Sequence, residues 1–204
     1  MSNRLYPPFE HEFELRQLTK ELLGGGVGGV FIDVGANVGC WTIDFAPLFS
    51  RVYAVEPWYA EQLRLNLRDY GIGNVEVVEA AAWDFNGMVI IGVGRVDNLV
   101  CGVRADVPRV GLPGRLVRSV RLDDVISEPF RLLKVDVEGE GLHVLRGMPR
   151  LLRESSGLAF IEVHNHGESH STYLFMREHG WRLDRTLGER HEDDWYHAYK
   201  IYRK

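Results

Sequence analysis

The sequence predicts an α/β fold with a mostly parallel central sheet. From residue 30 to residue 80, short apolar runs of strand type alternate with segments whose apolar residues recur at helical spacing. Near the C-terminus, two further strand-type runs follow each other without a helix between them. The composition, with 45% hydrophobic and 26% charged residues in a chain of 204, is typical of one packed domain. We therefore expect residues 1–204 to form a single domain.

The first part of the chain is expected to hold a lead-in and three strands joined by helices. Residues 1–29 contain one packing helix, over residues 9–23, and a glycine-rich lead-in that ends it. Continuous apolar runs predict buried strands at residues 30–34, 51–55 and 75–78. Between them, one helix runs through residues 41–49, shortened by Pro47, and a second begins at Pro57.

The second part is expected to begin with a small β insertion at residues 87–122. Its β-branched runs are separated by glycine and proline, and they cover residues 88–93, 96–103 and 116–122. The alternation then resumes, with strands at 130–137 and 158–163. Helices are predicted at 140–146 and 171–179, and a further helical turn ends at residue 153. Two closing strands, at residues 181–187 and 195–202, are predicted to form a hairpin at one edge of the sheet.

A glycine-rich turn after the first predicted strand is the strongest functional signal. Asp33 ends that strand, Gly35 and Gly39 permit a sharp turn, and a helix follows. The glycines of residues 24–29 imitate a dinucleotide fingerprint, but they precede the strand instead of following it. A carboxylate beside helix-terminal N–H groups suits a cofactor with an amino acid end, such as S-adenosylmethionine (SAM). The alternative is a tight connection in which Asp33 caps the helix.

Glu56 adds a second acid at the end of the next predicted strand. In an open parallel sheet its carboxylate lies at the same edge as Asp33, where it can accept hydrogen bonds from both hydroxyls of a ribose. Taken alone, Glu56 before Pro57 could be an ordinary acid at a helix start. Together, Asp33 and Glu56 predict a cofactor cleft onto which both carboxylates open.

These motifs and several later ones give the chain a family resemblance. The segments concerned are residues 31–39 (FIDVGANVG), 54–57 (AVEP), 120–126 (VRLDDVI), 133–139 (LKVDVEG), 144–147 (VLRG) and 161–164 (IEVH). They resemble class I SAM-dependent methyltransferases, and more narrowly the FkbM-type methyltransferase family. The resemblance covers most of the chain, from about residue 31 to residue 164, and its later segments are the more specific to this family.

The resemblance implies a Rossmann-like, doubly wound sheet with an antiparallel closing strand, and transfer of a methyl group, usually to oxygen. It also implies that the cofactor is held by Asp33, Gly35, Asn37, Gly39 and Glu56. Residues 81–84 would flank the adenine, with Trp83 against the ring and Asp84 near the exocyclic amine. Trp83 is equally well interpreted as a packing aromatic.

Three residues near the fourth core strand are candidates for the chemistry. An alcohol is a poor nucleophile at neutral pH and needs a base or a metal ion to take its proton. Asp136 ends the strand and Glu138 follows it, so both can face the methyl group, and Lys134 points the same way from deeper in the strand. We therefore predict Asp136 as the base. Alternatively, the two acids start the next helix and Lys134 is a strand-end partner.

Glu162 and His164 share one face of the neighbouring predicted strand. This carboxylate–imidazole pair beside Asp136 could serve as a base or as part of an oxygen-and-nitrogen metal site. We group His164 with the catalytic candidates and assign no metal ligand, because a divalent metal has only weak support from the spacing. Four other histidines are interpreted as surface or packing residues: His170, His179, His191 and His197.

Charge and hydropathy narrow the expected partners. The net charge of −5 argues against a nucleic acid partner. No apolar run reaches the roughly 18 to 20 residues of a membrane span, and no secretory signal precedes the fold, so we expect a cytoplasmic protein. The predicted activity is SAM-dependent O-methylation of a small molecule, sugar, or glycan- or polyketide-like metabolite, with release of S-adenosylhomocysteine (SAH). The alternatives are an RNA ribose methyltransferase and a non-catalytic cofactor-binding protein of the same fold. A homo-oligomer is compatible with the sequence.

Overall fold

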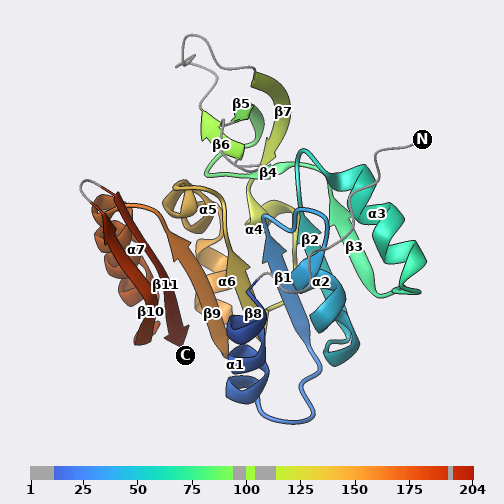
Figure 1. Ribbon diagram of the computed structural model, residues 1–204, viewed down its shortest axis with the longest axis horizontal. Coiled ribbons are helices and arrows are strands. Elements are labelled where there is room, and N and C mark those ends of the chain that lie inside the picture. The colour runs from blue at the N-terminus through green and yellow to red at the C-terminus, as the bar shows by residue number, and fades with distance from the viewer. Residues whose placement is uncertain (1–11, 94–99, 104–113, 193–194) are drawn as a thin grey trace.

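A seven-stranded sheet forms the centre of the computed structural model, which describes residues 12–93, 100–103, 114–192 and 195–204 (Figure 1). Its strands lie in the order β10 (Arg182–Glu192), β11 (Trp195–Arg203), β9 (Leu158–Val163), β8 (Leu132–Val135), β1 (Val30–Val34), β2 (Arg51–Val55) and β3 (Val75–Val78). The five strands from β9 to β3 are parallel, whereas β11 pairs antiparallel with β9 and with β10. This confirms the predicted mostly parallel sheet with an antiparallel closing hairpin.

Helices cover both faces of the sheet and bury it completely along its central strands. One face packs against α4 (Leu122–Val125), α5 (Gly141–Arg146), α6 (Pro149–Glu154) and α7 (His166–Glu178), and the other against α1 (Phe13–Leu23), α2 (Cys40–Phe45) and α3 (Ala60–Asp69). Successive β1 residues point to opposite faces, so Ile32 belongs to the first core and Phe31 to the second. Burial on both faces is why β1 reads as a continuous apolar run.

A second, smaller sheet stands beyond the carboxyl ends of the parallel strands (Figure 1). It contains β4 (Ala81–Ala82), β7 (Gly114–Val120), β5 (Gly87–Val93) and β6 (Val100–Val103), in that order. Strand β5 pairs antiparallel with both β6 and β7, as predicted for the insertion. Residues 96–99 of one predicted strand lie outside the described residues. The sheet matters for function because it places β5 over the edge where β1 and β2 end.

Several element boundaries differ from those predicted. Helix α3 begins at Ala60 and not at Pro57, because the backbone between them turns around the Glu56 carboxylate. Helix α7 begins earlier than predicted, at His166, because the Asn165 side chain caps it by accepting the N–H of Glu168 at 2.8 Å. Strand β8 is shorter than predicted, and β4 and α4 were not predicted at all. No helix of the described part is long and apolar enough to cross a membrane.

The lead-in helix α1 is fixed by charge as well as by apolar contact. Leu15, Leu18 and Leu22 of α1 pack partly buried against the second core, as expected of a packing helix, whereas Phe13 is 54% exposed and the fully buried residues are Arg16 and Thr19. Arg16 Nη1 lies 2.9 Å from Asp44 Oδ2 on α2, and Lys20 Nζ lies 2.6 Å from Asp44 Oδ1. The helix is therefore held to α2 by one shared carboxylate.

We expect Asp44→Ala to lower the free energy of unfolding by about 1–3 kcal/mol, because the buried Arg16 guanidinium loses this carboxylate. Glu154→Ala is the matched control, since it breaks an exposed pair with Arg150 and should cost at most about 1 kcal/mol. Urea unfolding of both variants measures the difference. Equal midpoints for the two variants would show that Asp44 does not anchor α1.

Candidate active site

An open cavity lies at the carboxyl edge of the large sheet, beneath the small one. Including the open solvent at its mouth, its volume is about 720 Å³. Its walls come from the ends of β1, β2 and β8, from the segment of β4, and from Ile91 of β5. The polar residues and Trp83 that line it are Asn37, Glu56, Tyr59, Trp83, Asp136, Glu138 and Glu140.

The glycine turn after β1 forms one side of this cavity. Gly35 has φ +78°, and a side-chain carbon there would lie 1.9 Å from the backbone oxygen of Asp136. Asn37 also has a positive φ, of 52°, and Gly39 has φ +105° with Leu63 packed closely against it. The N–H groups of Gly35 and Ala36 donate to Val55 O, which joins the turn to β2. The turn therefore needs glycine both for its conformation and for its close approach to β8.

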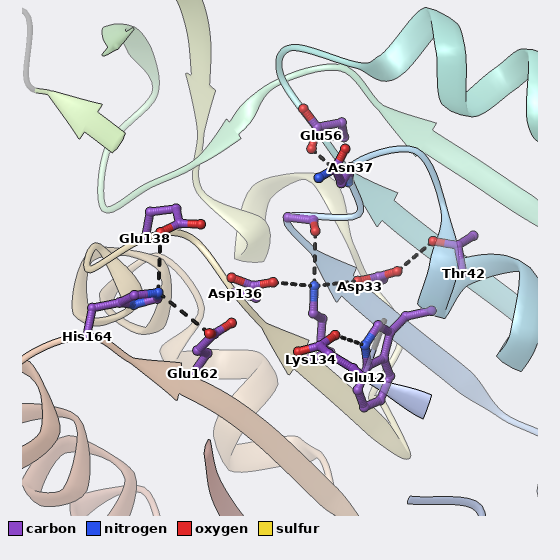
Figure 2. A network of polar contacts seen from close by, with 12 residues as sticks. Glu12, Asp33, Asn37, Thr42, Glu56, Lys134, Asp136, Glu138, Glu162 and His164 are labelled. Carbon is purple, nitrogen blue, oxygen red and sulfur yellow. Dashed lines mark hydrogen bonds and ion pairs between the residues drawn. The ribbon is translucent and has the colours of Figure 1, made fainter. Parts of the chain in front are cut away.

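Glu56 holds this turn and the start of α3 together. One carboxylate oxygen accepts the N–H of Asn37 at 2.9 Å (Figure 2), and the other accepts those of Trp58 at 2.7 Å and Tyr59 at 3.0 Å. The residue is 6% exposed, and burial raises its pKa although these N–H groups favour the charged form. A carboxylate has about four lone-pair positions, so capacity remains toward the cavity that Glu56 lines.

Asp33 does not open onto the cavity, and here the prediction from the sequence is wrong. Its side chain is fully buried on the α2 side of β1, where it accepts the hydroxyl of Thr42 at 2.6 Å. Lys134 Nζ lies 3.7 Å away on the adjacent strand β8, and burial raises the Asp33 pKa. The contacts of Asp33 therefore support the turn from below, and Glu56 is the one of the two acids that lines the cavity.

Lys134 and Asp136 meet at the end of β8 (Figure 2). Lys134 Nζ donates to Gly35 O at 3.0 Å and lies 3.1 Å from Asp136 Oδ2. Burial opposes the charge of Asp136, but the adjacent ammonium and the hydrogen bonds from Glu162 and Lys134 together outweigh it and lower the carboxyl pKa below its usual range. Asp136 lines the cavity as predicted, but this ion pair makes it a weaker base than the sequence suggests.

Glu138, Glu162 and His164 lie beside Asp136, and Figure 2 shows the imidazole between the two glutamates. His164 Nε2 is 3.3 Å from Glu138 Oε2 and 3.7 Å from Glu162 Oε1. Burial, together with the charge of Asp136, raises the Glu138 pKa to about 7. Burial also lowers the His164 pKa, and it raises the pKa of Glu162, which hydrogen-bonds to Asp136. The structure thus brings the predicted catalytic residues into one group.

Three residues of this group were not predicted from the sequence. His197 on β11 is no surface residue: its Nε2 hydrogen-bonds to Glu162. Glu12, ahead of α1, accepts the Trp41 Nε1–H at 2.7 Å and hydrogen-bonds to Tyr199. Glu12 and Tyr199 line a smaller cavity together with Asp136 and Glu162. The sequence signal was the alternation of residues 195–202, which places His197 and Tyr199 on one strand face but cannot show what faces them.

Trp83 and Asp84 take different positions at the other end of the cavity. Trp83 is 2% exposed, lines the cavity, and stacks on His143 with ring centres 4.6 Å apart. Asp84 is not part of the wall; its Oδ2 lies 2.7 Å from His143 Nδ1. The structure thus fits both readings of Trp83, as a packing aromatic and as a wall for a flat ring.

The sheet order, the closing hairpin and this cavity define a Rossmann-like methyltransferase fold. Solved structures that share the fold include an rRNA methylase from Streptococcus thermophilus, with a TM-score of 0.60 and 14% identity over 94% of each chain. A Streptococcus mutans protein solved in complex with SAH has a TM-score of 0.60 and 14% identity, over 95% of this chain and 98% of that one.

The chain belongs to the FkbM family of SAM-dependent methyltransferases. The model of the methyltransferase FkbM domain matches residues 33–183. The methyltransferase FkbM from Methylobacillus flagellatus has a TM-score of 0.56 and 20% identity, over 87% of this chain and 44% of that one. This chain therefore spans less than half the length of that structure. No curated protein matches the sequence.

Proposed function

We propose that this domain binds SAM in the cavity and transfers its methyl group to a hydroxyl of a small molecule, sugar, or glycan- or polyketide-like metabolite. The single observation that carries the proposal is the placement of Glu56 and of the Asp136–Glu138 pair in the walls of one cavity. Glu56 is suited to accept hydrogen bonds from the ribose hydroxyls, and the turn at Gly35 to lie against the amino acid end. Asn37 and Gly39 shape that turn, whereas Asp33 supports it from below.

In this proposal, the acceptor oxygen attacks the methyl carbon in line with the departing sulfur. The carbon–sulfur bond breaks, its electron pair stays on sulfur, and SAH is the product. Asp136, fixed by Lys134, positions the acceptor hydroxyl. Glu138 faces the same cavity and has an imidazole partner instead of an ammonium, so we assign it the proton that leaves the hydroxyl. His164 then positions the Glu138 carboxylate.

Incubation of the purified protein with methyl-labelled SAM and pools of hydroxylated acceptors tests this function. We expect label in an acceptor ether and stoichiometric SAH. Calorimetry with SAM and SAH tests the binding step separately. Heat with SAH but no turnover on any pool would favour a cofactor-binding protein, and the absence of heat with both ligands would overturn the proposal.

One observation favours an RNA ribose acceptor. Lys134, Asp136 and Glu162 lie together, and they resemble a Lys/Asp/Glu set that some methyltransferases use on ribose hydroxyls. The net charge of −5 weighs against it. Binding to bulk RNA that weakens as the salt concentration rises would favour this alternative, because phosphate contacts release counterions.

Replacement of Glu56 is expected to weaken cofactor binding. Glu56→Ala should raise the Kd for SAH about 10- to 100-fold, because hydrogen bonds to a charged group contribute about 1.5–3 kcal/mol. Glu56→Gln keeps the shape and should fall between Glu56→Ala and the wild type. Glu79→Ala, which breaks an exposed pair with Arg64, is the control and should bind SAH normally. Calorimetry that gives one Kd for all four proteins would remove Glu56 from the cofactor site.

A further inference from the structure

Four side chains gather beside the proposed acceptor position, at the carboxyl ends of β8 and β9 and near the start of the antiparallel strand β11. We call Glu138, Glu162, His164 and His197 the histidine–carboxylate cluster. One ligand atom from each of Glu162, His164 and His197 lies within 4.8 Å of the others, and the same holds for Asp136, Glu138 and His164. Two imidazoles and a carboxylate, from the end of β9 and from β11, thus converge on one point.

The orientation of the imidazoles favours a cation between them. Nε2 of His164 and Nε2 of His197 both face the same oxygen, Glu162 Oε1. On the far side of the His164 ring, Nδ1 lies 3.9 Å from Glu168 Oε2. This distance is too long for a hydrogen bond, and Nδ1 is buried without a hydrogen-bond partner among the described residues. A metal ion on Nε2 would place the ring proton on Nδ1, on the side of Glu168, and a carboxylate on that side of a ligating histidine is the usual second layer of a metal site.

Glu168 is itself held rigidly, so it can serve as that outer carboxylate. One of its oxygens accepts the N–H of His164 at 2.8 Å, and the other accepts the N–H of Gly141 at 3.0 Å. The side chain of Glu168 is 3% exposed. These bonds fix the loop after β9 and the start of α5 to α7, which holds the backbone of His164 in place.

The local charge balance also favours a cation. Lys134 is already shared among Gly35 O, Asp33 and Asp136. Within the described part of the chain, the ion pairs of Glu138 and Glu162 are with imidazoles and not with lysine or arginine. Lys134 therefore serves Asp136, and Glu138 and Glu162 have no ammonium or guanidinium group of their own within ion-pair distance in this part of the chain.

We infer that the histidine–carboxylate cluster binds one divalent transition-metal ion, with Glu162 Oε1, His164 Nε2 and His197 Nε2 as protein ligands. Two imidazoles and one carboxylate suit Zn²⁺, Co²⁺ or Fe²⁺ better than Mg²⁺, which prefers oxygen. Three protein ligands leave a position open, as catalytic metal sites do. The role of the ion rests on the proposed function: as a Lewis acid beside Asp136 and Glu138, it would lower the pKa of the acceptor hydroxyl.

Titration of the chelator-treated protein with Co²⁺, followed by visible absorption, tests the inference without any methyl donor. We expect one equivalent to bind, Zn²⁺ to displace it, and Mg²⁺ to leave it in place. His197→Ala and Glu162→Gln should each weaken Co²⁺ binding by at least about 100-fold, and Glu168→Gln by about 10- to 100-fold. His170→Ala, an exposed histidine on α7, is the matched control and should bind Co²⁺ as the wild type does.

Absence of stoichiometric Co²⁺ and Zn²⁺ uptake by the wild type would overturn the inference, as would equal Co²⁺ affinity in His197→Ala and the wild type. Thermal melting of each metal-free variant shows whether weaker Co²⁺ binding reflects a lost ligand or a loss of folding. Glu168→Gln keeps all three ligands, so its Co²⁺ affinity tests the second layer separately. SAH binding is measured by calorimetry on the same preparation. Protein that binds SAH but no metal contradicts only this inference, and protein that binds metal but no SAH contradicts only the proposed function.

Discussion

Glu138→Gln is expected to reduce the rate of methyl transfer by about 10²- to 10⁴-fold, because the amide cannot take the hydroxyl proton. Its affinity for SAH should stay within about threefold of the wild type, since Glu138 faces the cavity at the acceptor end, away from Glu56. Single-turnover rates with labelled SAM, together with calorimetry, measure the two effects separately.

Asp136→Asn is the informative companion to that variant. It keeps the size of the side chain and its place beside Lys134, and we expect it to lower the rate less than Glu138→Gln does and to raise the KM for the acceptor. A larger rate loss in Asp136→Asn would restore Asp136 as the base, as the sequence predicted. Equal loss of SAH binding in either variant and in Glu56→Ala would contradict the division of the cavity into a cofactor end and an acceptor end.

Gly35→Ala is expected to abolish measurable SAH binding and to lower the free energy of unfolding by about 2–4 kcal/mol. The added carbon would lie 1.9 Å from the backbone oxygen of Asp136, so the ends of β1 and β8 would have to separate. Because Lys134 donates to Gly35 O, the same movement disturbs the ion pair that fixes Asp136.

Gly73→Ala is the matched control for Gly35→Ala. Its added carbon meets no atom within 4 Å, and the change should alter stability by less than about 1 kcal/mol and leave SAH binding unchanged. Urea unfolding and calorimetry on both variants make the comparison. A Gly35→Ala protein that folds and binds SAH normally would show that the turn does not touch the cofactor.

The sequence by itself determined the central strands and the turn that ends the first of them. Strands β1, β2, β3 and β9 have the predicted bounds. Burial in the sheet explains the short apolar runs of β1, β2 and β9, whereas the edge strand β3 is only partly buried, contrary to the prediction. The position of the Gly35 turn and of Glu56 beside one cavity was also predictable, since parallel strands bring their carboxyl ends to one edge whatever the details of packing.

Only the tertiary structure decided which side chains share a point in space. Asp33 turned out to be buried because the face to which the end of β1 directs it depends on where α2 packs. Lys134 and Asp136 lie two residues apart and share one side of the end of β8, as the alternation predicted, but only the pairing of β8 with β1 brings Asp33 beside Lys134 as well. His197 joined the cluster because β11 inserts between β10 and β9, so that Tyr199 lies opposite Glu162. A local pattern fixes the face of a strand on which a residue lies, but long-range pairing fixes what that face meets.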